Sequence, residues 1–188
     1  MAEGERVVLH LDLDAFFVSA ERRRDARLNN RPIIIGGQSG RAVVASCSYE
    51  ARRFGVRSAM PMALAKRLCP EALVLHGDMD LYTQCSQEVT GIIADQVPSF
   101  EKASIDEFYA DLSGMDRYFG CYRWASELRQ RIIAETHLPL SFGMANCKTV
   151  SKVATGEAKP NGQHRVPQGA ERPFLAPLPV ERLPMAGP

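Results

Sequence analysis

Long hydrophobic runs are missing from this sequence, and so is a hydrophobic leader at its start. No apolar stretch approaches the roughly 20 residues that a membrane-spanning helix requires. The opening residues, MAEGER, are too polar for a secretory signal peptide. Internal repeats and low-complexity tracts are also missing. These absences predict a cytoplasmic globular protein with no membrane partner, made of one domain or two small ones.

Cysteine is present, but not in a pattern typical of metal sites or disulfides. The five cysteines are odd in number and scattered, they form no C-x-x-C pair, and the four histidines do not cluster with them. This spacing argues against a zinc site and against a disulfide framework. We therefore expect reduced, mostly buried thiols at Cys47, Cys69, Cys85, Cys121 and Cys147.

Charge of either sign is unevenly distributed, although the net charge is only +1. Residues 21–70 carry eleven basic and three acidic side chains, residues 71–116 carry ten acids and one base, and residues 117–188 carry ten bases and five acids. A basic block beside an acidic block suits a protein that holds polyphosphate with one part and divalent cations with another. The alternative is a chance partition of surface charge.

Hydrophobic periodicity and turn residues predict alternating strands and helices. Strands are expected over residues 6–13, 32–36, 41–47, 100–112 and 138–145. Helices are expected over residues 15–28, 49–54, 61–68, 79–96, 117–135 and 148–157. Outside residues 16–79 this order predicts an α+β fold, in which a ferredoxin-like, helix-backed sheet holds a small inserted α/β lobe. The proline-rich tail from Val166 is typical of a linker or of an element cut short.

Two aspartates stand at the end of the first predicted strand. Asp12 and Asp14 are two residues apart, so both side chains can point the same way, or Asp14 can turn away to cap the next helix. Acids at the end of a buried strand are costly unless they bind something. Haloacid dehalogenase-like phosphatases use this arrangement with one aspartate as nucleophile, and some glycosyltransferases hold a metal with D-x-D. The pattern alone leaves these alternatives open.

A second acidic pair, Asp106 and Glu107, lies inside the segment SIDEFY. Adjacent carboxylates in an ideal strand point to opposite faces, so both reach one site only at a twist, a bulge or a sheet edge. Magnesium prefers oxygen ligands together with substrate phosphates. In combination with Asp12, the pair therefore favours a magnesium site over a surface hairpin that merely tolerates acids.

A third feature is basic. Tyr49 and Arg52 are three residues apart on a short predicted helix and hence on one face, Ser46 precedes that helix, and Lys159 follows the last predicted helix. Arginine suits forked contacts to phosphate and lysine suits a mobile point charge. The alternative for Arg52 is a solvated cation in a basic lobe.

Four segments together resemble the Y-family DNA polymerases and, within that family, the polymerase IV branch. They are LDLDAFF at 11–17, SYEARRFGVRSAMP at 48–61, SIDE at 104–107 and AKPNGQ at 158–163. The resemblance implies a translesion polymerase that transfers nucleotides from dNTPs to a primer 3′-hydroxyl at low fidelity, in DNA repair and damage bypass. It also implies a palm at 1–15 and 80–166, fingers at 16–79, and a linker with a truncated start of the thumb at 167–188.

The same resemblance implies a role for each matching acidic or aromatic residue. Two Mg²⁺ ions would be bound by the carboxylates of Asp12, Asp106 and Glu107, with the backbone carbonyl of Leu13 as a further ligand. Phe17 matches the steric gate, whose ring would collide with a 2′-hydroxyl and so exclude ribonucleotides.

Further matching residues would contact the nucleotide and the DNA. The expected nucleotide-binding residues are Phe16, Phe17, Ser46, Tyr49, Arg52 and Lys159. Lys148 and Lys152 match a helix that approaches the DNA backbone, where lysines position the duplex without reading its sequence.

The implied partners are primer–template DNA, an incoming dNTP, and a sliding clamp reached through a C-terminal part beyond this chain. A monomer associated with the bacterial nucleoid is expected. Because most of the thumb and the little finger are absent, we expect a fragment of a longer polymerase that binds DNA weakly, with a naturally short relative as the alternative. A non-catalytic paralogue is the alternative, but such a protein is expected to lose metal carboxylates, whereas Asp12, Asp106 and Glu107 are all retained.

Overall fold

The computed structural model describes the chain apart from residues 1–5, 38, 40, 98, 116–119 and 187–188. The chain forms two compact units. Unit 1 consists of Met1–Asp14 and Ser86–Pro188, and unit 2 consists of Ala15–Cys85. Both units combine helices with a sheet, which confirms the predicted α+β class. No helix among the described residues is long and apolar enough to cross a membrane.

Unit 1 is built on a five-stranded sheet with the order β5-β6-β1-β7-β8. The strands are β1 (Val8–Leu13), β5 (Phe100–Lys102), β6 (Glu107–Asp111), β7 (Leu140–Ala145) and β8 (Gln163–Arg165). The central strand β1 is antiparallel to both β6 and β7, whereas β7 and β8 are parallel. This is the expected ferredoxin-like arrangement. The single strand expected over 100–112 is wrong in detail, because that segment forms the β5–β6 hairpin.

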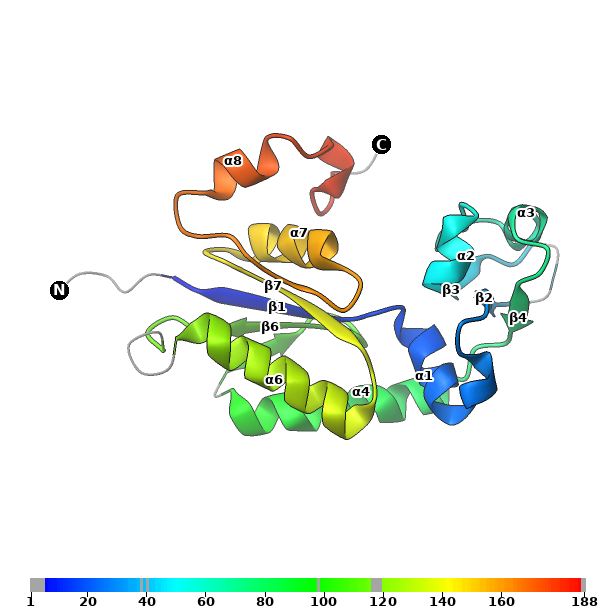
Figure 1. Ribbon diagram of the computed structural model, residues 1–188, viewed down its shortest axis with the longest axis horizontal. Helices are drawn as coiled ribbons and strands as arrows, with labels where there is room; N and C mark the ends of the chain where they lie inside the picture. The colour runs from blue at the N-terminus through cyan, green and yellow to red at the C-terminus, as the bar shows by residue number, and fades with distance from the viewer. Residues whose placement is uncertain (1–5, 38, 40, 98, 116–119, 187–188) are drawn as a thin grey trace. The chain divides into compact units, whose positions relative to one another are not determined.

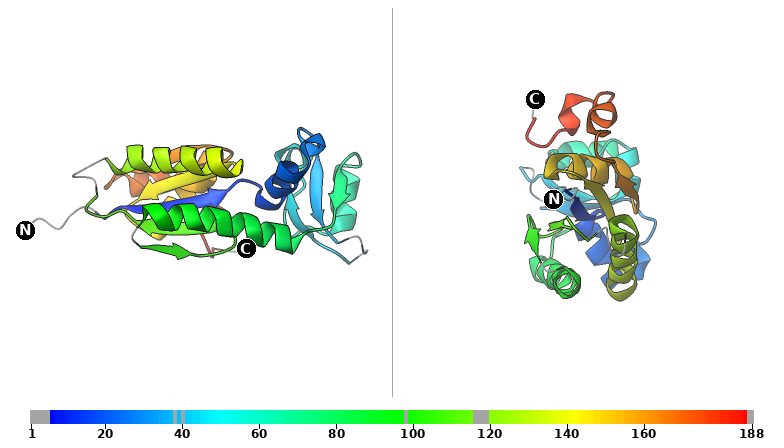
Figure 2. Two further views of the ribbon diagram at one scale, coloured as in Figure 1. Left: turned by 90° about the horizontal axis from the view of Figure 1, so that it is seen from below. Right: turned by 90° about the vertical axis from the view of Figure 1, so that its left-hand side faces the viewer.

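Helices cover both faces of this sheet (Figures 1 and 2). Residues 86–96 of α4 (Met79–Gln96) and α6 (Cys121–Thr136) lie on one face, and α7 (Lys148–Ala158) lies on the other. Side chains alternate along β1, so the fully buried leucines face α4 and α6 while His10 and Asp12 face α7. The polar residues of β1 are thereby gathered on the α7 face.

Helix α7 packs unusually close to the sheet because β7 has a glycine beneath it. A Cβ atom at Gly143 would lie 2.5 Å from the Thr155 backbone nitrogen and nearer still to the Ser151 carbonyl oxygen. No other residue leaves that space. The close approach brings the side chains of α7 directly over His10 on β1, the partner of Gly143 in the ladder.

The C-terminal segment departs from the expected linker. It contains α8 (Glu171–Leu175) and the 3₁₀ turn η2 (Val180–Arg182). Pro173 lies in the first turn of α8, where the backbone N–H groups have no partner within the helix, so proline costs little there. The prolines of this segment therefore do not prevent short helical turns.

Unit 2 is built on a three-stranded sheet with the order β3-β2-β4. The strands are β2 (Ile33–Gly36), β3 (Val44–Cys47) and β4 (Leu73–Leu75), and the helical elements are α1 (Phe16–Arg24), η1 (Ala26–Leu28), α2 (Tyr49–Arg53) and α3 (Met62–Leu68). Ile34 joins a cluster that includes α2 and α3, whereas Ile33 and Ile35 pack with Val18 of α1. Burial on both faces explains why β2 is continuously apolar.

Local capping explains where the helices of unit 2 begin and end. Ser48 caps α2, since its side chain accepts a hydrogen bond from the Ala51 N–H. The helix expected over 15–28 ends instead at Arg24, because Asp25 is extended and caps η1. In unit 1, α6 begins at Cys121, and residues 117–119 of the helix expected there lie outside the described residues. The five cysteines are thiols, and Cys147 is the only one that is not buried.

Candidate active site

Three carboxylates gather at one end of the unit 1 sheet. The antiparallel register places Asp12 of β1 opposite Glu107, the first residue of β6. Asp106 lies one position earlier, in the hairpin turn, and its carbonyl oxygen accepts a hydrogen bond of 3.1 Å from the Leu13 N–H. Because Asp106 precedes the strand, the alternation of faces does not separate it from Glu107. The sheet therefore brings together Asp12, Leu13, Asp106 and Glu107.

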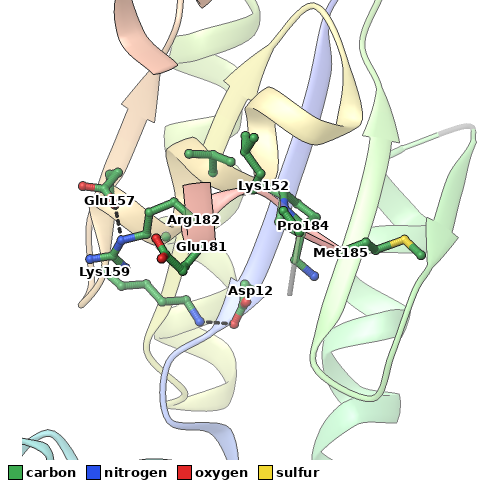
Figure 3. A pocket seen from close by; sticks show the side chains of 12 residues that line it. Asp12, Lys152, Glu157, Lys159, Glu181, Arg182, Pro184 and Met185 are labelled. Atoms are coloured by element: carbon green, nitrogen blue, oxygen red, sulfur yellow. Dashed lines mark hydrogen bonds and ion pairs between the residues drawn. The ribbon is translucent and has the colours of Figure 1, made fainter. Parts of the chain in front are cut away.

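Each of these carboxylates has a polar partner. Lys159 donates to Asp12, Lys152 of α7 donates to both Glu107 oxygens at 2.8 Å, and the Ser104 hydroxyl donates to Asp106 at 2.6 Å. Figure 3 shows the Lys159 side chain extended toward Asp12. The acidic cluster is thus neutralised by lysines from α7 and from the residue that follows it.

Neighbouring carboxylates differ in proton affinity. Burial raises the pKa of Asp12 to about 7, although Lys159 pulls it down, and the charges of Asp106 and Glu107 raise it further. Burial also raises the pKa of Glu107, but the hydrogen bonds and charge of Lys152 outweigh that effect and leave the pKa below its usual value. At neutral pH Glu107 is therefore ionised, whereas Asp12 holds a proton more strongly than an ordinary aspartate.

Metal affinity at Asp12 should depend on pH around neutrality. Since the pKa of Asp12 is raised to about 7, protons compete with a metal ion up to that pH. We expect Mg²⁺ affinity to fall about tenfold per pH unit below that value, whereas a carboxylate of ordinary pKa would bind undiminished to roughly pH 5. Calorimetric Mg²⁺ titrations from about pH 5.5 to about pH 8.5 measure this. Affinity that stays constant across the range would contradict it.

His10 adjoins this cluster, although sequence reasoning did not single it out. Its ring is 1% exposed and lies with its centroid 4.6 Å from that of Tyr109. Burial lowers the pKa of His10 to about 4. A ring nitrogen of His10 and carboxylate oxygens of Asp12 and Glu107 lie within 4.8 Å of one another. The signal was present in the sequence: His10 precedes Asp12 by two residues on a strand and therefore shares its face.

Asp14 has a structural role rather than a capping or catalytic one. Its carboxylate accepts hydrogen bonds from the Ser141 hydroxyl at 3.0 and 2.9 Å and from the Asn161 N–H at 2.6 Å. Helix α1 is instead preceded by Ala15, which makes no side-chain cap hydrogen bond. Asp14 thus ties the end of β7 to the loop after Lys159. This arrangement leaves no support for a phosphatase that uses both Asp12 and Asp14.

A pocket of about 490 Å³ opens beside Asp12. Lys152, Glu157 and Lys159 line one side, and residues 181–186 line the other (Figure 3). Arg182 approaches Glu157 to 3.4 Å and holds the C-terminal segment against α7. Charged side chains line the pocket together with apolar ones such as Val153, Leu183 and Met185.

Lys148, expected at the DNA backbone, lies at the start of α7. Its Nζ atom contacts Glu101 at 2.5 Å and lies 5.2 Å from the centroid of the Tyr109 ring. Lys152, expected in the same role, is held by Glu107 as described. Both lysines share the α7 face of unit 1 with the acidic cluster, and their contact with DNA remains a prediction.

The expected phosphate-binding residues of unit 2 lie around α2. Arg52 lies over the Tyr49 ring, with its guanidinium carbon 4.7 Å from the ring centroid, which confirms that the two share a face. Ser46 is on β3 and nearly buried. Other members of the basic block are already paired: Arg22 contacts Glu50 at 2.9 Å. The block is therefore only partly available to a ligand.

Phe17, the expected steric gate, rests on a second aromatic ring. Its ring stacks on Tyr82 with centroids 4.3 Å apart and planes 11° apart. Tyr82 is fully buried, and its hydroxyl donates to Glu21 at 2.8 Å. Phe16 is buried beside them. Sequence reasoning did not identify Tyr82 as the support of this ring, because it is 65 residues away from Phe17 in the chain.

Comparison with known proteins gives one consistent result. Residues 11–156 match the impB/mucB/samB family. "DNA polymerase IV" of Dehalococcoides mccartyi (strain CBDB1) is 45% identical over 184 residues, which are 97% of this chain and 47% of the relative. "DNA polymerase IV" of Treponema denticola (strain ATCC 35405) is 42% identical over 178 residues, 94% of this chain and 45% of the relative.

A solved structure agrees with these relatives. The "Insertion ternary complex of Dbh DNA polymerase" has a TM-score of 0.88 at 27% identity, over 96% of this chain and 54% of that one. This chain therefore spans about half the length of the proteins that it matches.

Proposed function

Since this chain belongs to the impB/mucB/samB family of Y-family polymerases, we propose that it forms the palm and fingers of a translesion DNA polymerase. The reaction is template-directed transfer of a nucleotide from a dNTP to a primer 3′-hydroxyl. The palm comprises residues 1–15 and 80–166, the fingers residues 16–79, and residues 167–188 lead to a thumb. The observation that carries the proposal is the register that sets Asp12 opposite Glu107 with Asp106 in the adjoining turn.

The donor set fits magnesium. Asp12, Asp106, Glu107 and the carbonyl of Leu13 offer oxygen ligands at the end of the sheet, and two Mg²⁺ ions are expected there. When bound, Mg²⁺ supplies charge neutralisation for the triphosphate and lowers the pKa of the primer hydroxyl. Lys159 contacts Asp12 of the acidic cluster when no nucleotide is bound. On nucleotide binding, its ammonium group contacts the triphosphate instead. Phosphoryl transfer depends mainly on positioning of the reacting groups and on stabilisation of the developing charge.

The remaining contacts follow from the two units. Arg52, Tyr49 and Ser46 bind the triphosphate, and the Arg52 guanidinium is preoriented by its contact with the Tyr49 ring. Lys148 and Lys152 contact the phosphates of primer–template DNA. The protein is a cytoplasmic monomer at the nucleoid, recruited by a sliding clamp.

Primer extension tests the proposal. The chain is assayed on a labelled primer–template with each single dNTP opposite each template base, with Mg²⁺ or with a chelator. A second protein is also assayed, a chimera in which residues 1–188 are joined to the second half of the Dehalococcoides mccartyi relative. The added half supplies further contacts to the primer–template duplex. We expect insertion directed by the template base and dependent on metal. Failure of both proteins to extend, with Asp12-dependent phosphatase activity in their place, would reject a polymerase.

Replacing Phe17 with alanine should weaken sugar discrimination. Without the ring, a 2′-hydroxyl meets no obstacle, so ribonucleotide insertion should rise roughly 10²-fold relative to dNTP insertion. Single-nucleotide insertion kinetics with matched dNTP and rNTP measure the ratio. The matched control is Phe54→Ala, which removes a 46% exposed phenylalanine of the same unit. Unchanged discrimination in Phe17→Ala would show that another residue is the gate.

A further inference from the structure

His10 has a buried nitrogen that the proposed reaction does not use. The side chain lies under α7 and is 1% exposed, and its Nε2 atom has no hydrogen-bond partner among the described residues. A buried polar atom without a partner is uncommon in folded proteins and calls for an explanation, of which an ion is one. The acidic side chains of Asp12 and Glu107 adjoin the ring on the same face of the sheet.

The contacts around Thr155 favour a proton on Nδ1 of the His10 ring. The Thr155 hydroxyl oxygen lies 2.7 Å from Nδ1 of His10, 2.9 Å from the Ser151 carbonyl oxygen and 3.2 Å from the carbonyl oxygen of His10 itself. The hydroxyl has one hydrogen, and the two carbonyl oxygens can only accept. Donation to a carbonyl leaves the hydroxyl oxygen to accept from Nδ1–H, so that two of the three contacts are hydrogen bonds, whereas donation to Nδ1 would leave both carbonyl contacts without a hydrogen.

In the favoured arrangement Nε2 carries a lone pair, which agrees with its lack of a hydrogen-bond partner in the described part of the chain. A second proton on the ring would create a buried N–H group with no acceptor. An imidazole that is held through its Nδ1–H and presents a bare Nε2 has the arrangement that histidine ligands of metals adopt, since the outer hydrogen bond sets both the tautomer and the ring orientation. Gly143 supports this arrangement, because it allows Thr155 to approach the sheet.

We propose that His10, Asp12 and Glu107 together bind a first-row transition-metal ion, through one imidazole nitrogen and two carboxylate oxygens. The candidate ligand atoms lie within 4.8 Å of one another, close enough to meet on one ion after small side-chain rotations. The inference rests on the proposed function in one respect: it shares two carboxylates with the proposed magnesium site. The entering ion replaces the charges of Lys152 and Lys159 on those carboxylates.

The nitrogen ligand makes the site selective. Mg²⁺ is held by oxygen ligands and water, and gains little from an imidazole. Imidazole suits Zn²⁺, Fe²⁺ and their neighbours in the first transition row, which also accept carboxylate oxygens. His10 therefore adds affinity for transition ions without adding affinity for Mg²⁺. Such an ion would compete with Mg²⁺ for Asp12 and Glu107.

Pulsed EPR of bound Mn²⁺ tests the inference directly. The tag-free chain is loaded with Mn²⁺, and electron spin-echo modulation reports whether a ¹⁴N nucleus is coordinated. We expect imidazole ¹⁴N modulation in the wild type and its loss in His10→Phe. Competition titrations should show that His10→Phe weakens Zn²⁺ and Mn²⁺ binding by roughly 10- to 100-fold. Mg²⁺ affinity should change by less than about threefold, because Mg²⁺ keeps its oxygen ligands.

The matched control is His164→Phe. His164 is an exposed histidine of β8 whose ring stacks on Phe174, so its replacement should leave the ¹⁴N modulation intact. If His10→Phe does not fold, the wild-type spectrum is compared with that of Thr155→Val instead. Valine removes the hydroxyl that accepts from Nδ1, so the imidazole should be held less firmly and the ¹⁴N modulation of bound Mn²⁺ should weaken.

Mn²⁺ bound without ¹⁴N modulation in the wild type, or modulation that depends on His164, would overturn the inference. Mg²⁺-dependent primer extension would then still support the proposed function. Conversely, ¹⁴N modulation in a chain and chimera that extend no primer would leave the metal site standing and reject the polymerase.

Discussion

Replacing Asp12 with asparagine should reduce primer extension by at least about 10³-fold without unfolding the chain. Asparagine has nearly the same shape and keeps one oxygen, but it carries no charge to hold a metal ion against the triphosphate. The substitution also leaves Lys159 without its carboxylate partner. Single-turnover insertion kinetics with the chimera measure the loss, and circular dichroism with thermal melting shows whether the fold survives.

The matched control for this prediction is Asp111→Asn. Asp111 is an exposed aspartate of β6, four residues beyond Glu107, and its Oδ1 accepts from the Ser113 N–H, a bond that asparagine can keep. Its replacement should change insertion by less than about threefold, because a solvated surface charge contributes little. Glu107→Gln should behave like Asp12→Asn. Equal activity of Asp12→Asn and the wild type would show that the acidic cluster is not the catalytic centre.

Replacing Gly143 with alanine should destabilise the chain by roughly 3 kcal/mol or more, because the added methyl group overpacks a contact between backbones. The new Cβ would lie 2.5 Å from the Thr155 nitrogen and 2.8 Å from its hydroxyl oxygen, and neither the helix backbone nor the sheet can yield locally. Helix α7 would have to shift, carrying Thr155 away from His10 and Lys152 away from Glu107. Urea unfolding followed by circular dichroism measures the change in the free energy of unfolding.

Gly91→Ala is the control for the same chemical change. Gly91 lies inside α4, and a Cβ atom there would meet nothing within 4 Å. Alanine in an open helix interior is favoured over glycine by about 1 kcal/mol, so this substitution should stabilise the chain. Opposite signs for the two substitutions are expected. A loss below about 1 kcal/mol for Gly143→Ala would mean that α7 is not tightly packed.

Local sequence signals predicted much of the secondary structure. The 18-residue helix α4 was placed at both ends, because apolar periodicity is clear over such a length. The strand expected over 32–36 and the helix expected over 49–54 are also found, as β2 and α2. The three-residue strands β4 and β8 were not, because such short segments carry no periodicity and become strands only by pairing with β2 and β7.

Only part of the candidate site could be predicted, again because local patterns can be recognised in the sequence and long-range contacts cannot. The carboxylates and the basic residues were found because they stand in motifs that can be recognised along the chain. Strand alternation could have placed His10 beside Asp12, but not its contact with Thr155. Tyr82 and the role of Asp14 were missed, since each depends on a partner far away in the chain, Phe17 and Ser141 respectively. Contacts of that kind follow from packing and have no local signature.

By itself, the sequence determined which side chains alternate on each strand, where the longer helices run, and which acids and bases are offered to a polymerase-like site. Tertiary structure decided the rest. The β1–β6 register set Asp12 against Glu107, and the close packing of α7 on Gly143 brought Lys152 to Glu107 and Thr155 to His10. Register and packing depend on surfaces contributed by distant segments, so they are settled only when the whole sheet and its covering helix have formed.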